Sequence, residues 1–164
     1  MQRYTAAVIT VSDKGYAGLR EDLSGPLIAE LLEQNGFDVV GRDIVPDEKD
    51  QIVAALRNRI GQAVALIVTT GGTGFAPRDV TPEATLEVCQ RRADGVAEAM
   101  RIKSLALTDR AMISRAVCGI ADRSVILNLP GSPKACRENL GFVLSPLRHG
   151  IDALLGNVTE CARK

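Results

Sequence analysis

The sequence predicts an α/β protein, a three-layer sandwich in which an open, mostly parallel sheet carries helices on both faces. Its first half alternates β-rich apolar runs with amphipathic helical runs in the order β-α-β-α-β. This order is typical of parallel sheets, because each helix returns the chain to the start of the next strand. The apolar run at residues 63–68 has no polar alternation, as expected of a strand buried on both faces. The 164 residues leave room for one domain, residues 1–164.

The expected strands share β-rich apolar composition, and we place them at residues 4–11, 37–45, 63–70, 115–120 and 124–129. The expected helices share apolar residues at helical spacing, and we place them at residues 26–35, 48–60, 83–92, 96–107 and 133–155. The last two strands are expected to form a hairpin around Ala121 and Asp122. The last helical pattern is interrupted at Pro146, because proline removes a backbone donor.

Four expected helices begin with similar local chemistry. Proline stands at the first helical position after Gly25, Thr81 and Ser132, and Asp47 is placed to cap the helix that begins at Glu48. In an open α/β sheet the residues that follow the strands gather at one edge, where ligands bind. The sequence therefore directs several helix N-termini toward one crevice.

The third expected strand ends in a glycine loop, Thr70-Gly71-Gly72-Thr73-Gly74. Glycines permit positive φ and lack the Cβ atoms that would block a ligand, so successive backbone N–H groups can converge on an anion. A tight turn is the simpler interpretation, but the threonine hydroxyls suit oxyanion binding better. The loop lacks the lysine of a P-loop and the third glycine of a dinucleotide fingerprint. We interpret it as part of a site for a magnesium nucleotide or a phosphate ester.

Two aspartates accompany this loop. Asp79 lies in a polar connection beside Arg78, which could partly neutralise it. A carboxylate at a phosphate site would repel a bare phosphate, so Asp79 indicates a bound divalent metal. From the residues alone, Asp47 is better explained as a helix N-cap, with Asp50 at the third helical position. Both carboxylates could hold Mg²⁺, or one could hold the metal while the other orients the attacking phosphate.

Weaker candidates follow the other strands. Ser12 and Asp13 end the first strand and either contact a nucleotide or form a turn. Ser132, followed by Pro133 and Lys134, offers a helix N-terminus with a hydroxyl and a cation. It is either a phosphate site or an ordinary capped helix.

The composition excludes several classes of function. Lys plus Arg and Asp plus Glu each number 20, and the charges are interspersed, which gives no support for binding nucleic acid or a membrane surface. Aromatic residues make up 3% of the chain, too few for the stacking surfaces of single-strand binders. The N-terminus has no signal-peptide profile, so we expect a cytoplasmic protein. The four cysteines, none in a C-x-x-C pair, are expected to be small buried hydrophobes rather than zinc ligands or redox groups.

Motifs over nearly the whole chain resemble the MogA/MoaB family of molybdenum cofactor biosynthesis proteins. The most specific is Gly71-Gly72-Thr73-Gly74 followed by PRDVTPEAT at residues 77–85. Weaker matches occur in family order at residues 10–13, 24–26, 45–48, 114–116 and 130–133. In one MoaB subgroup the acidic residue after the equivalent of Pro46 and the DVTP sequence are lost. This chain keeps both and therefore resembles the MogA-like members.

The resemblance implies a molybdopterin adenylyltransferase, which uses Mg²⁺ with ATP to attach AMP to the terminal phosphate of its substrate, molybdopterin, before molybdate insertion. It implies that Asp47 and Asp79 are the catalytic and metal-binding residues, which reverses the preference for a simple cap at Asp47. The implied substrate- and nucleotide-binding residues are Ser12, Asp13, Thr70, Gly71, Gly72, Thr73, Gly74, Thr81, Ser114, Pro130, Gly131 and Ser132.

The resemblance also implies a homotrimer of three-layer subunits and contact with the molybdate-insertion protein of the same pathway. Within residues 96–107, the apolar side chains of Met100, Ile102, Leu105 and Leu107 are candidates for an interface.

Two other functions stay open. One is a non-catalytic molybdopterin-binding or scaffolding module of the MoaB type, against which the presence of both Asp47 and Asp79 argues. The other is a nucleotide hydrolase or small-molecule kinase, which would lack the usual phosphate-binding lysine. The sequence shows no assembled Ser-His-Asp or Cys-His nucleophile, so we expect catalysis by positioning and electrostatics.

Overall fold

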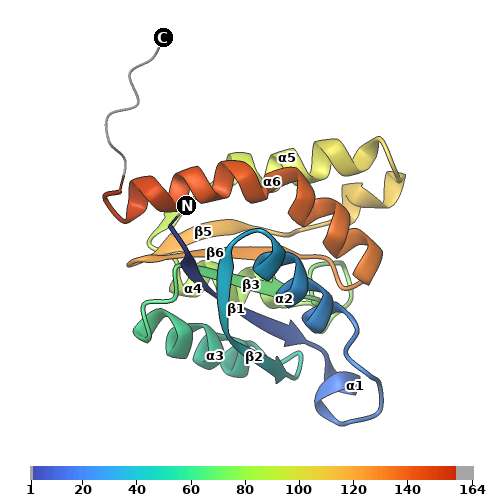
Figure 1. Cartoon of the computed structure of the whole chain (residues 1–164). Coiled ribbons are helices and arrows are strands. Elements are labelled where there is room, and N and C mark those ends of the chain that lie inside the picture. The colour runs from blue at the N-terminus through green and yellow to red at the C-terminus, as the bar shows by residue number, and fades with distance from the viewer. Residues whose placement is uncertain (1, 158–164) are drawn as a thin grey trace.

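The computed structural model describes residues 2–157 and shows one six-stranded sheet between two layers of helices (Figure 1). The strands are β1 (Tyr4–Val11), β2 (Phe37–Val45), β3 (Leu66–Thr70), β4 (Arg91–Arg92), β5 (Cys118–Ala121) and β6 (Ser124–Leu129). The helices are α1 (Asp13–Tyr16), α2 (Ser24–Gln34), α3 (Lys49–Gly61), α4 (Thr81–Val88), α5 (Asp94–Leu105), the 3-10 helix η1 (Asp109–Ile113) and α6 (Pro133–Leu154).

The sheet has the strand order β2-β1-β3-β6-β5-β4. The four strands β2, β1, β3 and β6 are parallel, whereas β5 and β4 are antiparallel to their neighbours at one edge. The chain passes from β1 to β2 on one side and then returns to β3 on the other side of β1. The strand order therefore switches direction between β1 and β3. These features confirm the predicted mostly parallel α/β sheet.

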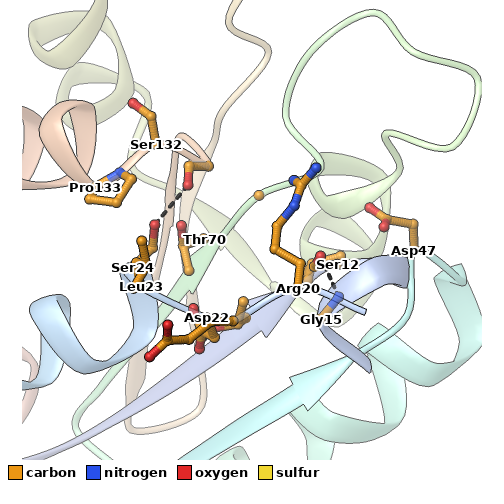
Figure 2. Close-up of a pocket in the computed structure, with 15 residues that line it drawn as sticks. Ser12, Gly15, Arg20, Asp22, Leu23, Ser24, Asp47, Thr70, Ser132 and Pro133 are labelled. Atoms are coloured by element: carbon orange, nitrogen blue, oxygen red, sulfur yellow. Dashed lines mark hydrogen bonds between the residues drawn. The ribbon is translucent and has the colours of Figure 1, made fainter. Parts of the chain in front are cut away.

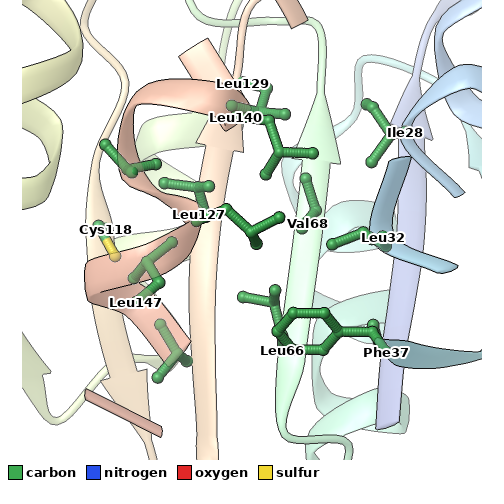
Figure 3. Packing of buried hydrophobic residues seen from close by; sticks show 14 of the residues in the cluster. Ile28, Leu32, Phe37, Leu66, Val68, Cys118, Leu127, Leu129, Leu140 and Leu147 are labelled. Carbon is green, nitrogen blue, oxygen red and sulfur yellow. The ribbon is translucent and has the colours of Figure 1, made fainter. Parts of the chain in front are cut away.

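Both faces of the central strands β1, β3 and β6 are buried, as the unbroken apolar run at residues 63–68 predicted for β3. One core lies between the sheet and helices α2, α5 and α6, and Figure 3 shows Ile28, Leu32, Leu66 and Leu140 among its side chains. The other core lies between the sheet and helices α3 and α4. Neighbouring residues of β1 contribute to different cores, because successive side chains of a strand point to opposite faces.

The expected helix at residues 83–92 is wrong at both ends. Helix α4 begins at Thr81 and ends at Val88, and Arg91–Arg92 form strand β4 beside β5. The third strand is also shorter than expected: it begins at Leu66, because Ala63 turns the chain after α3 with φ of 55°. Strand β5 begins at Cys118 rather than at residue 115. The hairpin is confirmed, with Asp122 in its turn at φ of 50°.

The expected interruption at Pro146 is wrong, because α6 continues through it. Proline lacks the N–H that would bond to the carbonyl four residues earlier, at Phe142. The Nζ of Lys103 on α5 donates to that carbonyl oxygen at 3.4 Å and also lies 5.5 Å from the centre of the Phe142 ring. A neighbouring helix thus satisfies the acceptor that the proline leaves free.

The start of β1 and the end of α6 lie together, at the end of the sheet where β1 begins (Figure 1). The hydroxyl of Tyr4 donates to the carboxylate of Asp152, and Arg148 donates to the carbonyl oxygens of Gln2, Asn35 and Gly36. These contacts are far along the strands from the edge at which β1, β2, β3 and β6 end.

The cysteine prediction is confirmed for Cys118 and Cys136, which are buried free thiols. Burial raises the pKa of Cys118 to about 12 and that of the half-buried Cys89 to about 11, so both stay protonated at neutral pH. Cys161 lies outside the described residues. Within residues 2–157, no helix combines the length and the apolar character needed to cross a membrane.

Candidate active site

A cavity of about 500 Å³ opens at the carboxyl ends of β1 and β3, where the strand order switches direction (Figure 2). The parallel register brings Val11, Val45, Thr70 and Leu129 to this one edge of the sheet. Ligands of open α/β sheets bind at such points. The lining residues come from the segments that follow these strands: Thr10, Val11, Ser12, Gly15, Arg20, Glu21, Asp22, Leu23, Ser24, Asp47, Thr70, Gly71, Gly131, Ser132 and Pro133.

The glycine loop requires glycine at two positions. Gly71 and Gly72 adopt φ of 95° and 66°, a left-handed region that strains other residues. A Cβ atom on Gly71 would collide with the carbonyl oxygen of Val11, and one on Gly72 would collide with Oγ1 of Thr81 and lie 3.3 Å from Oδ1 of Asp47. The loop therefore lies in direct contact with the segments after β1 and β2.

Thr81 does not cap α4 as expected. The N-cap position is Val80, and the buried Thr81 hydroxyl donates to the carbonyl oxygen of Gly71 at 2.9 Å. The backbone N–H of Thr81 donates to the carbonyl oxygen of Gly72 at 3.1 Å. Thr81 thus lies beneath the loop and holds its backbone in place.

The segment Pro130-Gly131-Ser132-Pro133, which follows β6, closes the opposite side of the cavity. Oγ1 of Thr70 donates to the carbonyl oxygen of Pro130 at 2.7 Å, and Oγ of Ser24 donates to that of Gly131, also at 2.7 Å. Ser132 caps α6 as expected, because its Oγ accepts from the N–H of Ala135 at 3.3 Å. The N-terminus of a 22-residue helix therefore lies at a cavity that the glycine loop also lines, although Pro133 has no N–H and those of Ala135 and Cys136 already bond to Ser132.

Asp47 lines the cavity and is not a helix cap. The N-cap residue of α3 is Glu48, without a side-chain cap bond. Oδ2 of Asp47 instead accepts from the N–H of Asp13 at 2.8 Å, and the N–H of Asp47 donates to Oδ1 of Asp13 at 3.0 Å. Burial, together with the charges of Asp13 and Asp79, raises the pKa of Asp47 above the ordinary aspartate value. A cation next to this carboxylate would relieve the unfavourable charge.

Arg78 does not neutralise Asp79 as expected. It donates to both oxygens of Asp13, at 2.6 and 3.0 Å, and to Glu48 at 2.8 Å. These bonds lower the pKa of Asp13 and raise that of Arg78. Asp13, which is absent from the cavity lining, therefore connects the segments after β1 and β2 to the loop that carries Asp79.

Asp79 lies beside the last glycine of the loop. Its Oδ2 accepts from the N–H groups of Gly74 and Ala76, each at 3.1 Å. It does not line the cavity, yet its charge contributes to the raised pKa of Asp47. Within residues 2–157, no three His, Cys, Asp or Glu side chains converge as a metal centre. A Mg²⁺ ion here would thus take ligands from two carboxylates and otherwise from phosphate and water oxygens, as Mg²⁺ commonly does.

The remaining predicted residues lie outside this cavity. Gly72, Thr73 and Gly74 form the far part of the glycine loop, and Thr73 is buried. Ser114 and Pro130 line a second cavity of about 240 Å³ between α5, η1 and α6, which Ser132 shares with the first. The structure thus brings Ser12, Asp47, Thr70, Gly71, Gly131 and Ser132 together in the large cavity.

Sequence reasoning missed three polar residues of the segment after α1, namely Arg20, Glu21 and Asp22. Asp22 accepts from Oγ1 of Thr10 at 2.8 Å and from the N–H of Gly25 at 2.9 Å. Its position three residues before Gly25 is a capping pattern that could have revealed it. Among the described residues of the lining, Arg20 is the only cation, and no hydrogen bond or ion pair engages its guanidinium. No motif distinguished it from other surface arginines.

The fold and the cavity define an α/β protein with a pocket at the switch in strand order, lined by Asp47 and by the start of a glycine loop. The model of the family described as "probable molybdopterin binding domain" matches residues 7–149. The chain belongs to this family, which confirms the resemblance seen in the motifs.

Individual relatives agree with this assignment. The chain is 41% identical over 167 residues to a molybdopterin adenylyltransferase of Helicobacter pylori, covering 100% of this chain and 95% of that one. It resembles the solved structure of the molybdopterin biosynthesis enzyme MoaB of Thermus thermophilus with a TM-score of 0.88 and 45% identity, covering 93% of this chain and 97% of that one. A solved MogA structure matches with a TM-score of 0.87 and 39% identity, covering 92% of this chain and 99% of that one.

Proposed function

We propose that this protein acts in molybdenum cofactor biosynthesis as a molybdopterin adenylyltransferase that transfers AMP from ATP to the terminal phosphate of molybdopterin. The observation that carries the proposal is the placement of two carboxylates against one glycine loop, Asp47 beside Gly72 and Asp79 beside Gly74. Asp47 also lines a cavity large enough for a nucleotide. Full-length similarity to adenylyltransferases supports the same activity. Retention of both aspartates favours it over a scaffolding module.

In the proposed reaction, an oxygen of the molybdopterin phosphate attacks the α-phosphorus of ATP, the bond to the bridging oxygen breaks and pyrophosphate leaves. Bound Mg²⁺ would neutralise phosphate charge, and Asp47 and Asp79 are the residues that would hold it. The N–H of Gly71 already donates to the carbonyl oxygen of Leu129, so the positive end of α6 is the backbone feature best placed to attract phosphate oxygens. Since no nucleophilic side chain is needed, the protein contributes position and electrostatic stabilisation.

The direct test incubates the protein with molybdopterin and Mg-ATP and seeks the adenylylated pterin by mass spectrometry. We expect product in the wild type and a loss on the order of 10²-fold in Asp79→Asn, typical of removing one electrostatic element. Molybdopterin binding without turnover would instead indicate a scaffolding module. Release of free phosphate from ATP without pterin would indicate a hydrolase.

We also propose that residues 1–164 act as one unit in the cytoplasm, as a homotrimer that passes its product to a molybdate-insertion protein. Support for assembly comes from exposed apolar side chains on α5, on η1 and in the connection between them. Ile102, Leu107 and Met112 are 68%, 57% and 69% exposed. Met100, which we expected to join this surface, is instead 2% exposed and belongs to the core, because it faces α6 and the sheet.

A further inference from the structure

Arg115 is tied to the glycine loop more extensively than any motif indicated. Its Nε donates to the carbonyl oxygen of Gly74 at 2.7 Å, its Nη2 donates to that of Asp79, and its Nη1 pairs with the carboxylate of Glu83. Its backbone N–H also donates to the carbonyl oxygen of Thr73, at 2.9 Å. Arg115 thus contacts the end of the glycine loop, the Asp79 that follows it and the first turn of α4.

These contacts enclose the segment that carries Asp79. Residues 75–78 are exposed, and the closing bonds within the segment are those from Gly74 and Ala76 to the Asp79 carboxylate and from the N–H of Asp79 to the carbonyl oxygen of Ala76. The segment is also tied to Asp13 and Glu48 through the exposed side chain of Arg78. Exposed loops held by few bonds open more readily than the core. The guanidinium of Arg115 adds two charge-assisted bonds from outside this segment, to the carbonyl oxygens of Gly74 and Asp79. These two residues are the ends of the turn, so the planar guanidinium fixes the distance between them.

We infer that Arg115 is a positioning residue that holds Asp79 in place relative to Asp47. The inference rests on the proposed function, in which both carboxylates serve the same metal and phosphates. It assigns Arg115 no contact with substrate. Its role is to keep the Gly74–Asp79 turn closed, so that the carboxylate of Asp79 stays at a fixed position before ligands arrive.

The test measures backbone amide hydrogen exchange by NMR in the ligand-free protein, comparing the wild type with Arg115→Met and Arg115→Lys. In Arg115→Met we expect the amides of Gly74, Ala76 and Asp79 to exchange about tenfold faster or more, which corresponds to losing one charge-assisted hydrogen bond or more. Amides of β3 should keep their wild-type rates. In Arg115→Lys, which retains the charge but not the forked set of donors, these amides should exchange at rates between those of the wild type and of Arg115→Met.

Arg148→Met is the matched control. Arg148 also donates to three backbone carbonyls, but at the opposite end of the sheet. It should leave exchange at Gly74, Ala76 and Asp79 unchanged. Wild-type exchange of these amides in Arg115→Met, or equal acceleration in β3, would overturn the inference. If Arg115→Met fails to fold, the exchange rates of the same three amides in Arg115→Lys provide the test, and wild-type rates there would overturn the inference.

A second measurement connects the turn to ligand binding. The Mg²⁺ concentration needed for half-maximal thermal stabilisation by α,β-methylene-ATP should rise about tenfold in Arg115→Met and stay unchanged in Arg148→Met. An unchanged Mg²⁺ requirement would contradict the role given to Arg115. Absence of adenylyl transfer in the wild type would defeat the proposed function alone, because the exchange measurement requires neither ATP nor turnover.

Discussion

At the scale of single residues, Asp47 combines an unfavourable charge with a central position. Burial and neighbouring carboxylates raise its pKa, so its ionised form is disfavoured in the folded protein. Because the folded protein favours the protonated form of Asp47, this carboxyl contributes its full stability below the ordinary aspartate pKa. The contribution is lost as the pH rises through the raised pKa of the folded state. At neutral pH the protein without ligand therefore tolerates a charge that a bound cation would compensate.

Asp47→Asn should remove the destabilising charge of Asp47 and so separate its effect on stability from its effect on turnover. The amide keeps an oxygen that can accept from the N–H of Asp13. We expect the ligand-free variant to be at least as stable as the wild type at about pH 7, with an advantage that shrinks toward about pH 4. Urea unfolding at both pH values measures this. Turnover should fall on the order of 10²-fold, and a variant that keeps full activity at saturating Mg²⁺ would exclude Asp47 from the chemistry.

Arg20 is the residue best placed to add positive charge to the large cavity, where the carboxylates of Glu21, Asp22 and Asp47 otherwise prevail. Arg20→Ala should weaken binding of Mg·α,β-methylene-ATP about 10- to 100-fold, the value of one charge-assisted hydrogen bond to phosphate. Calorimetry measures the affinity. Arg123→Ala, in the hairpin turn at the other end of the sheet, is the control and should bind like the wild type. Equal affinities for both variants would remove Arg20 from the site.

At the scale of elements, the sequence was most informative where one local rule decided the outcome. Unbroken apolar runs predicted the buried strands, and the glycines after Thr70 predicted a loop that only glycine can form. Tertiary contacts decided the rest. Thr81 resembles a cap in sequence, but its hydroxyl bonds to Gly71 because the loop lies against it. Asp47 likewise pairs with Asp13, 34 residues away, which no local pattern reveals.

Helix α6 offers a test of such tertiary compensation. Pro146→Ala would supply the N–H that the carbonyl of Phe142 lacks, while Lys103 already donates to that carbonyl from α5. Removing a helix-interior proline gains up to about 3 kcal/mol in an uncompensated helix. We expect a gain of about 1 kcal/mol here, because Lys103 satisfies the acceptor in part. The free energy of urea unfolding measures it, and a gain near the full value would show that the Lys103 bond contributes nothing.

At the scale of the whole molecule, one surface that the described fold leaves exposed is the group of apolar side chains on and between α5 and η1. If it forms the proposed trimer, light scattering at micromolar concentration should give three times the monomer mass. Ile102→Lys should shift the mass toward the monomer, because a charge would enter an apolar contact. A monomer mass for the wild type would exclude the trimer. Glu98→Lys, at an exposed position of α5, tests whether any charge change on this helix has the same effect.

The bond between Tyr4 and Asp152 has a consequence for how the protein can be joined to other proteins. It brings the start of β1 and the end of α6 to one end of the sheet, while the cavity lies at the other end. A domain fused beyond either segment would extend away from the glycine loop and from Arg20. We therefore expect fusion at either side to leave nucleotide binding unchanged, so that this fold can be inserted into longer polypeptides without redesign of its site.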